Sequence, residues 1–261
     1  MTDYENTAMS FGAVLTPSGV NFSLYSKNAT KVVLHLFEKA TSKQSYKQIE
    51  LDPVLNKTGD IWHIFVKGLK EGTLYLYKVD GPYNPPEGLR FNYSKYLFDP
   101  YAKAFTKGSV FTSYNKMHEG LISGNDTGEL ADLSDFPKCV VINDNFNWED
   151  DKPLNYPLDK TIIYETHLKG FTASKSSKVK AAGTFKGMTE KIDYLKSLGI
   201  TSVELLPVFE FDEFENSNVN PATGKKLVNY WGYSTIGFFA PKTSYAYDKS
   251  DGGAVTEFKE M

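Results

Sequence analysis

The chain has 261 residues, which is enough for one large domain or two ordinary ones. Its 41% hydrophobic and 23% charged content is typical of a soluble globular protein. The net charge of -3 gives no electrostatic basis for binding nucleic acid or an anionic membrane surface. A single cysteine excludes an intrachain disulfide framework, and no apolar run reaches the roughly 18 residues of a membrane span. The first residues lack the basic and apolar regions of a signal peptide, and we expect a cytoplasmic protein.

Four short apolar or alternating segments near the start of the chain predict β-strands separated by turn residues: 20–25, 31–37, 61–66 and 73–79. Short strands at this spacing predict a β-sandwich that ends near residue 85. His35 and His63 lie inside these strands. We expect them to be exposed or hydrogen bonded rather than metal ligands, because no cysteine or acidic residue is suitably spaced.

Residues 107–160 are loop-like and rich in Gly, Asn and Asp, and we expect residues 86–160 to be a connector across the junction of two domains. Cys139 stands beside an apolar run within this connector. No base is placed near it in the sequence, and we therefore expect a buried small apolar group rather than a nucleophile.

The pattern changes at Thr161, where a strand at 161–165 is followed by a helix and a second strand at 202–208. The helix is predicted by apolar residues at helical spacing from Met188 to Leu198, and Gly199 is expected to end it. A strand, helix and strand in this order predict two parallel strands. Two parallel strands expose their edges and bury little, which indicates a domain that is interrupted.

A long polar loop is predicted at 209–227, and three aromatic rings follow it: Tyr230, Trp231 and Tyr233. Loops longer than about 12–15 residues in compact domains are usually functional or disordered. Rings on a loop at the end of a strand can stack on the flat apolar face of a sugar, although they can also form a second small core. Aromatic residues make up 15% of the chain, which also suits carbohydrate binding. A further helix is predicted from Asp251.

Several motifs, in the right order, resemble one family. Residues 162–172 resemble the first barrel strand of the α-amylase superfamily (glycoside hydrolase family 13), and 195–208 resemble its first helix and second strand. Residues 229–241, Asn-Tyr-Trp-Gly-Tyr-Ser-Thr-Ile-Gly-Phe-Phe-Ala-Pro, resemble the isoamylase and glycogen-debranching branch. The segments 59–63 and 77–83 resemble the family 48 carbohydrate-binding module that precedes such barrels.

The resemblance implies a multidomain fold: an immunoglobulin-like β-sandwich at 10–85, the connector, and at 161–261 the first part of a (β/α)8 TIM barrel, truncated. It implies a retaining glycosidase that cleaves α-1,6 branch linkages of glycogen-like α-glucan, with no cofactor or metal. The family carries its catalytic carboxylates after later barrel strands. The acidic residues of the barrel segment match none of those positions: Glu165, Glu204, Asp212, Glu213 and Glu215. Residues 1–261 alone are therefore expected to be inactive.

The resemblance also assigns substrate-binding residues. Tyr233 is expected to stack under the sugar at the cleavage site, with Trp231 and Asn229 shaping the pocket; the alternative for both rings is a place in the core. Trp62 and Tyr83 are candidate glucan contacts on the sandwich, although Trp62 equally fits a core position. Two other functions stay open: a stand-alone α-glucan-binding module, and a trehalohydrolase or branching enzyme of the same superfamily. The oligomeric state is left open.

Overall fold

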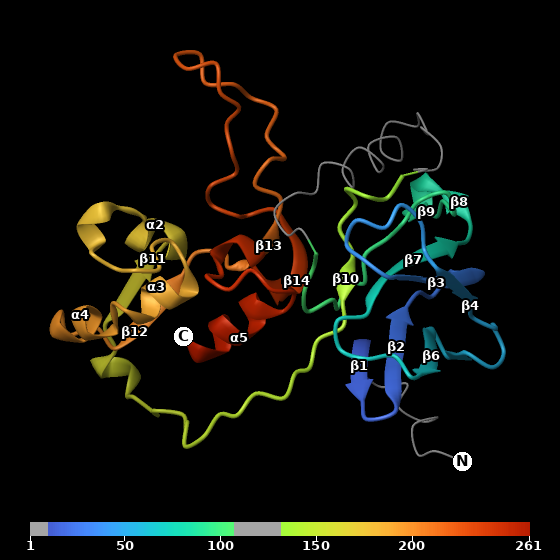
Figure 1. Ribbon diagram of the computed structural model, residues 1–261, viewed down its shortest axis with the longest axis horizontal. Coiled ribbons are helices and arrows are strands. Elements are labelled where there is room, and N and C mark those ends of the chain that lie inside the picture. Colours follow the sequence, from blue (N-terminus) through green and yellow to red (C-terminus); the bar gives the residue numbers. More distant parts are fainter. Residues whose placement is uncertain (1–9, 107–131) are drawn as a thin grey trace.

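The computed structural model describes residues 10–106 and 132–261. It has two parts: a β-sandwich, coloured blue to green in Figure 1, and a smaller α/β part, coloured yellow to red. An extended stretch after β10 (Cys139–Val140) runs between them along the lower edge of the picture. Within the described ranges, no helix is long and apolar enough to cross a membrane.

The sandwich consists of two four-stranded antiparallel sheets. The strands of the first sheet lie in the order β1 (Gly12–Thr16), β2 (Gly19–Tyr25), β6 (Ile61–Lys67) and β5 (Lys57–Thr58). Those of the second lie in the order β10, β7 (Leu74–Asp80), β3 (Lys31–Phe37) and β4 (Lys47–Glu50). The four predicted strands are therefore confirmed.

The inner faces of the two sheets form the main core. Along β2 the apolar side chains of Val20, Phe22 and Leu24 recur at every second position and are all buried. The ring of Phe22 meets the ring of Tyr75 on β7 edge to face, with the centroids 5.1 Å apart. Such interdigitation of two inner faces is the packing of a sandwich.

The connector takes part in this core, which extends past residue 85. It begins with a hairpin of β8 (Tyr83–Asn84), η1 (Pro85–Glu87) and β9 (Leu89–Arg90). Residues farther along it are buried in the same cluster: Tyr96, Ala102, Ala104, Phe105, Leu133, Phe136, Cys139, Val140, Val141 and Ile142. The sandwich needs these residues because they cover apolar positions of its sheet. The boundaries at 85 and 160 stay predictions.

Cys139 is fully buried on β10, and its sulfur accepts a hydrogen bond from the backbone N–H of Asp99 at 3.4 Å. Burial raises the pKa of its thiol well above the usual value. A thiol that stays protonated is a poor nucleophile, which confirms the expected apolar role.

The α/β part begins after η2 (Leu158–Lys160) with the strands β11 (Ile163–Thr166) and β12 (Ser202–Leu205). These two strands are parallel, as predicted, with Tyr164 opposite Val203. Between them lie α2 (Leu168–Ala173), η3 (Lys175–Ser177), α3 (Phe185–Thr189) and α4 (Ile192–Ser197).

The prediction of one continuous helix from Met188 to Leu198 is wrong, because α3 and α4 are separate. The break lies at Glu190 and Lys191. The carboxylate of Glu190 accepts hydrogen bonds from two backbone N–H groups of the preceding loop, at 2.9 and 3.0 Å, which anchors the end of α3 there. Gly199 ends α4 as predicted, with a φ of 78° that suits glycine.

The predicted loop at 209–227 is wrong at its start, where β13 (Phe209–Phe211) pairs with β14 (Thr235–Pro241) in antiparallel orientation. A buried ion pair fixes this hairpin: the amino group of Lys242 lies 2.9 Å from the carboxylate of Glu210, and both side chains are fully buried. The same carboxylate also accepts hydrogen bonds from the N–H and the hydroxyl of Thr243, which satisfies the buried charge. After η4 (Thr243–Tyr245), α5 (Gly253–Glu260) forms the helix predicted from Asp251.

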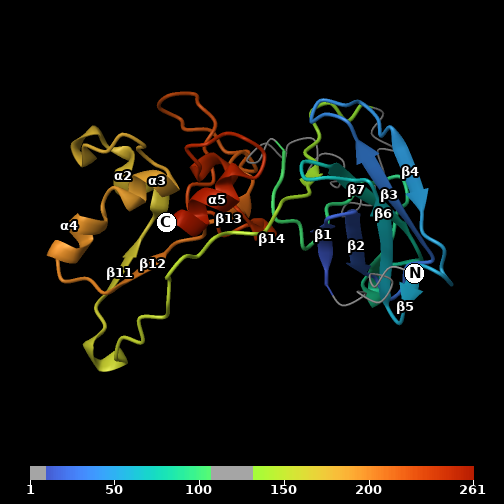
Figure 2. The same ribbon diagram turned by 60° about the horizontal axis from the view of Figure 1, so that its bottom comes forward.

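β14 and α5 join the α/β part to the sandwich, and Figure 2 shows them between the two. The ring of Phe239 stacks on that of Tyr101, with the centroids 4.8 Å apart. Asp144 accepts hydrogen bonds from Lys103 at 2.5 Å and from Lys259 on α5 at 2.6 Å. The strands β11 and β12 contribute nothing to these contacts, so the junction depends on the chain after residue 235.

Candidate functional site

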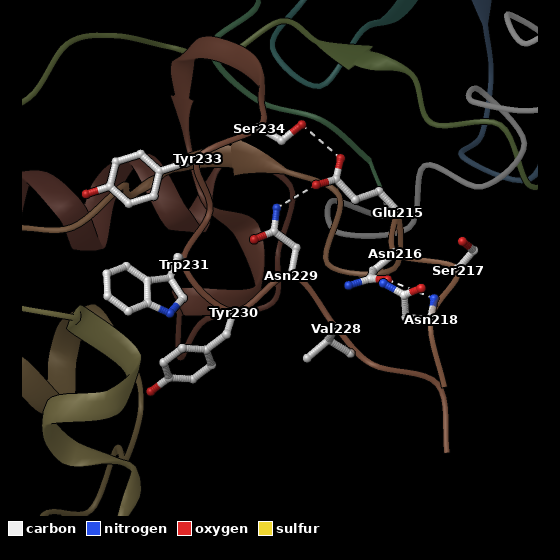
Figure 3. Close-up of a pocket in the computed structure, with 10 residues that line it drawn as sticks. All are labelled: Glu215, Asn216, Ser217, Asn218, Val228, Asn229, Tyr230, Trp231, Tyr233 and Ser234. Atoms are coloured by element: carbon white, nitrogen blue, oxygen red, sulfur yellow. Dashed lines mark hydrogen bonds between the residues drawn. The ribbon is translucent and has the colours of Figure 1, made fainter. Parts of the chain in front are cut away.

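The three predicted rings lie on a tight turn, residues 229–234, that leads into β14. The turn ends the long loop that projects from the molecule between β13 and β14, coloured orange in Figure 1. It lines an open pocket of about 820 Å³, together with residues 215–218 of the outgoing arm of the loop (Figure 3). The three rings lie on one side of this turn in Figure 3, and residues 216–218 lie on the other.

Asn229 and Glu215 hold the turn in shape. The amide nitrogen of Asn229 donates a hydrogen bond to the Glu215 carboxylate at 2.7 Å, and the Ser234 hydroxyl donates to the other carboxylate oxygen at 2.8 Å (Figure 3). The side-chain oxygen of Asn229 accepts a hydrogen bond from the N–H of Gly232 at 3.0 Å. Asn229 is therefore a structural centre of the turn, and its amide is engaged on both sides.

Tyr230 joins the turn to the end of β11 through His167. The two rings stack with centroids 4.2 Å apart and an interplanar angle of 11°. The Nε2 atom of His167 lies 2.7 Å from the carbonyl oxygen of Tyr230, and its Nδ1 atom accepts a hydrogen bond from the N–H of Gly170 in α2. Since Nδ1 accepts a hydrogen bond, the proton of the neutral ring lies on Nε2, which donates a hydrogen bond to the carbonyl oxygen of Tyr230.

Trp231 and Tyr233 face solvent. Their exposed fractions are 60% and 70%, against 46% for Tyr230, and their ring centroids lie 6.3 Å apart with a 35° tilt. Between them, Gly232 rests on the buried ring of Phe211. Trp231 and Tyr233 are therefore outside the core that the described residues form. Two adjacent exposed rings on a braced turn can stack on apolar faces of a ligand.

The carboxylates near the turn are engaged in hydrogen bonds. Glu213 lies 3.5 Å from Lys169 and 3.4 Å from the hydroxyl of Ser244. Burial raises the pKa of Tyr245, and the negative charge of Glu213 raises it further. The hydroxyl oxygen of Tyr245 lies 3.3 Å from the Nε2 atom of His167. The phenol therefore stays protonated and can donate a hydrogen bond.

Three further acidic residues of this part differ in exposure. Asp212 is buried, and its carboxylate accepts a hydrogen bond from the N–H of Phe214 at 2.8 Å. Glu165 and Glu204 are exposed and lie opposite each other on β11 and β12. Among the residues that the structure describes, no group of three His, Cys, Asp or Glu side chains could hold a metal ion.

The structure separates the two ring candidates on the sandwich. Trp62 is only 1% exposed, and its indole N–H donates to the carbonyl of Ser26 at 3.2 Å. Its ring belongs to the core, so the glucan contact proposed for Trp62 is wrong. The ring lies between the two sheets because its position on β6 faces inward. Tyr83 is 56% exposed at the start of β8 and stays a candidate. His35 and His63 are hydrogen bonded to Ser45 and Thr58, respectively.

Two residues that hold the turn, His167 and Glu215, were not singled out for this role in the sequence. Both lie far from the turn along the chain, and only the folded loop brings them to it. For His167 a signal was available in its position, because it lies two residues after the predicted strand at 161–165 and strand ends often carry functional side chains.

The structure thus combines a sandwich with a pair of parallel strands, and aromatic rings are held at the carboxyl end of β11. Comparison with protein families agrees: residues 10–102 match carbohydrate-binding module 48 (isoamylase N-terminal domain), and residues 163–236 match the α-amylase catalytic domain. The chain is therefore similar to glycoside hydrolases of the α-amylase family, and in particular to isoamylases and glycogen debranching enzymes.

Individual relatives support this placement. The chain is 40% identical over 259 residues to isoamylase 1, chloroplastic, of Arabidopsis thaliana, covering 95% of this chain and 31% of that protein. It is 38% identical over 256 residues to a glycogen debranching enzyme of Serratia proteamaculans, covering 97% and 36%. A pullulanase structure from Paenibacillus barengoltzii, in complex with maltohexaose and α-cyclodextrin, superposes with a TM-score of 0.68 at 21% identity, covering 95% and 34%. The chain thus spans about a third of the length of these proteins.

Proposed function

We propose that this chain contributes the glucan-binding module and the first strands of a (β/α)8 barrel to a retaining glycosidase that hydrolyses α-1,6 branch linkages in glycogen-like α-glucan. The observation that carries the proposal is the exposed ring pair Trp231–Tyr233 on a turn held at the carboxyl end of β11. Loops at the carboxyl ends of the strands build the active sites of such barrels. The names of the relatives, isoamylase and glycogen debranching enzyme, favour branch-point cleavage.

Within this proposal, Tyr233 stacks on the sugar ring at the cleavage site, Trp231 forms a neighbouring wall, and Asn229 keeps the turn in shape. Retaining cleavage needs two carboxyl groups about 5–5.5 Å apart. Glu213 and Glu215, the acidic residues nearest the turn in sequence, are engaged in hydrogen bonds. Residues 1–261 expressed alone should therefore bind α-glucan without hydrolysing it. The location of the protein in the cytoplasm stays a prediction.

The test is calorimetric titration of maltohexaose into the 261-residue chain, compared with its Tyr233→Ala and Tyr247→Ala variants. Tyr247 is the matched control, because it is a similarly exposed tyrosine outside the pocket. Loss of one stacked ring costs on the order of 1 kcal/mol, or about a fivefold weaker affinity, and should appear in Tyr233→Ala only. Equal affinities of the wild type and Tyr233→Ala would refute the assignment. Release of reducing sugar from pullulan by this chain would refute the expected inactivity.

A stand-alone glucan-binding module is the second candidate, and exposed Tyr83 on the sandwich favours it. The two candidates place the principal glucan contact on different parts of the molecule. If Tyr83→Ala abolishes sedimentation with insoluble starch and Tyr233→Ala leaves it unchanged, the sandwich is the binding part. A trehalohydrolase or branching enzyme of the same family would differ in the reaction it catalyses. Analysis of the products formed by an enzyme of the full length of the relatives would reveal that difference.

A further inference from the structure

The turn at 229–234 is held at both ends by one carboxylate. The two oxygens of Glu215 accept separate hydrogen bonds: one from the amide of Asn229, where the turn begins, and one from the hydroxyl of Ser234, where it ends (Figure 3). A carboxylate that accepts two such bonds fixes the separation of the two donors, because its oxygens are rigidly spaced.

The rings of Trp231 and Tyr233 are oriented by the backbone that carries them, in which Gly232 rests on the buried ring of Phe211. Both are more than half exposed. The anchor at Tyr230, formed by His167, fixes only the residue before them. The direction of both rings therefore follows from the backbone between Asn229 and Ser234, which Glu215 spans.

We propose that Glu215 is a positioning residue for glucan recognition, which holds the Trp231–Tyr233 ring pair in its binding geometry by spanning the turn that carries it. This rests on the proposed function of the turn. A platform that is already ordered loses less conformational entropy when the glucan binds, so removing the carboxylate should weaken affinity by loosening the turn. Its effect should depend on Ser234, because the two residues act through one hydrogen bond.

The variants Glu215→Ala, Glu215→Gln and Ser234→Ala test this in the 261-residue chain. Glu204→Gln is the matched control, because it removes an exposed carboxylate on β12. Maltohexaose affinity is measured by calorimetry, and the turn itself is followed by hydrogen exchange of the Gly232 N–H, which donates to Asn229. Urea unfolding shows whether any variant has lost its fold.

We expect Glu215→Ala to bind maltohexaose about three- to tenfold more weakly, the size expected for one or two lost hydrogen bonds. Exchange at Gly232 should be faster, while the urea midpoint stays near that of the wild type. Glu215→Gln should lie between, because its carbonyl oxygen still accepts one hydrogen bond. The combination of Glu215→Ala with Ser234→Ala should bind no more weakly than Glu215→Ala alone. Glu204→Gln should match the wild type in both measurements.

Wild-type affinity and wild-type exchange at Gly232 in Glu215→Ala would overturn the inference, provided that Tyr233→Ala still loses binding. If Tyr233→Ala binds maltohexaose as tightly as the wild type, the proposed function itself is wrong. In that case the exchange measurement still decides the role of Glu215, since unchanged exchange would show that its carboxylate does not hold the turn.

Discussion

The imidazole of His167 lies parallel to the ring of Tyr230 at 4.2 Å, and its Nε2 atom donates to the carbonyl of the same residue at 2.7 Å. One side chain thus binds both the ring and the backbone of another that is 63 positions away in the chain. The remaining nitrogen accepts the N–H of Gly170, so the same imidazole also caps the start of α2. The strand end, the first helix and the ring-bearing turn meet at this residue.

Substituting His167 should separate these roles. His167→Ala removes the cap, the stacked ring and the hydrogen bond to Tyr230, and should lower the free energy of unfolding by about 2 kcal/mol. His167→Asn retains a good cap acceptor and should lose only about half of that. Urea unfolding of the two variants gives the comparison. An equal loss in both would show that the cap at Gly170 contributes nothing measurable.

Gly232 should be intolerant of any side chain. Its φ is 83°, and a Cβ atom there would lie 2.7 Å from the buried ring of Phe211. Gly232→Ala combines backbone strain with this clash, whereas Gly224→Ala in the same loop has a φ of 66° and open space around its Cβ position. Backbone strain alone costs about 1 kcal/mol. We expect Gly232→Ala to lose at least twice as much stability as Gly224→Ala, and thermal unfolding of both variants measures the difference. Similar losses would mean that Phe211 can move aside.

Asp99 should make the sandwich less stable as the pH rises from about 4 to 6. Burial raises its pKa to about 6, although hydrogen bonds from the N–H of Tyr101 and the hydroxyl of Tyr75 act in the opposite direction. The unfolded chain titrates near 3.8, so the native state binds more protons in this window. The stabilisation is complete below about pH 4 and is lost as the pH passes about 6, up to roughly 3 kcal/mol.

The measurement for Asp99 is urea unfolding followed by tryptophan fluorescence, in which buried Trp62 reports on the sandwich, in the wild type and in Asp99→Asn. The asparagine side chain stays neutral throughout. Its stability relative to the wild type should therefore increase between pH 4 and pH 6 and then level off. A constant difference over this range would contradict the buried, titrating carboxyl group.

Residues with local patterns could be predicted well from the sequence. The strand of Val20, Phe22 and Leu24 shows its buried face in its alternation, and the parallel pair β11–β12 follows from the strand–helix–strand order. The ring turn was found because three aromatic residues in a polar region have few local explanations. In each case the residues that determine the structure are neighbours in the chain.

Features that depend on distant contacts could not be predicted. The start of the long loop becomes β13 because Glu210 meets Lys242, 32 positions later. Trp62 fits a surface contact or a core position equally well in its strand, and only the opposite sheet decides between them. The same holds for Glu215, which has no chemical signature until Asn229 and Ser234 reach it. Hydrogen bonds across a loop leave no periodicity in the sequence.

Limited proteolysis should cut the chain between the two parts of the molecule, and the two products should stay bound to each other. Every residue from 147 to 160 is exposed, so chymotrypsin should cut this stretch readily at Trp148 or Leu154. The two products should still elute together from a sizing column, because β14 and α5 hold the sandwich through the Tyr101–Phe239 stack and the Asp144–Lys259 ion pair.

The variant Gly237→Leu tests this explanation, because a Cβ atom at Gly237 would collide with the edge of the Phe105 ring on the sandwich side, and one of the two must shift. Its cleaved products should elute separately, while those of Gly224→Leu, which has open space, should stay together like the wild type. The intact Gly237→Leu chain should lose some stability of the sandwich, because Phe105 also belongs to the sandwich core. Separation of the wild-type products would show that the extended stretch, rather than the packing of β14 against Phe105, holds the two parts together.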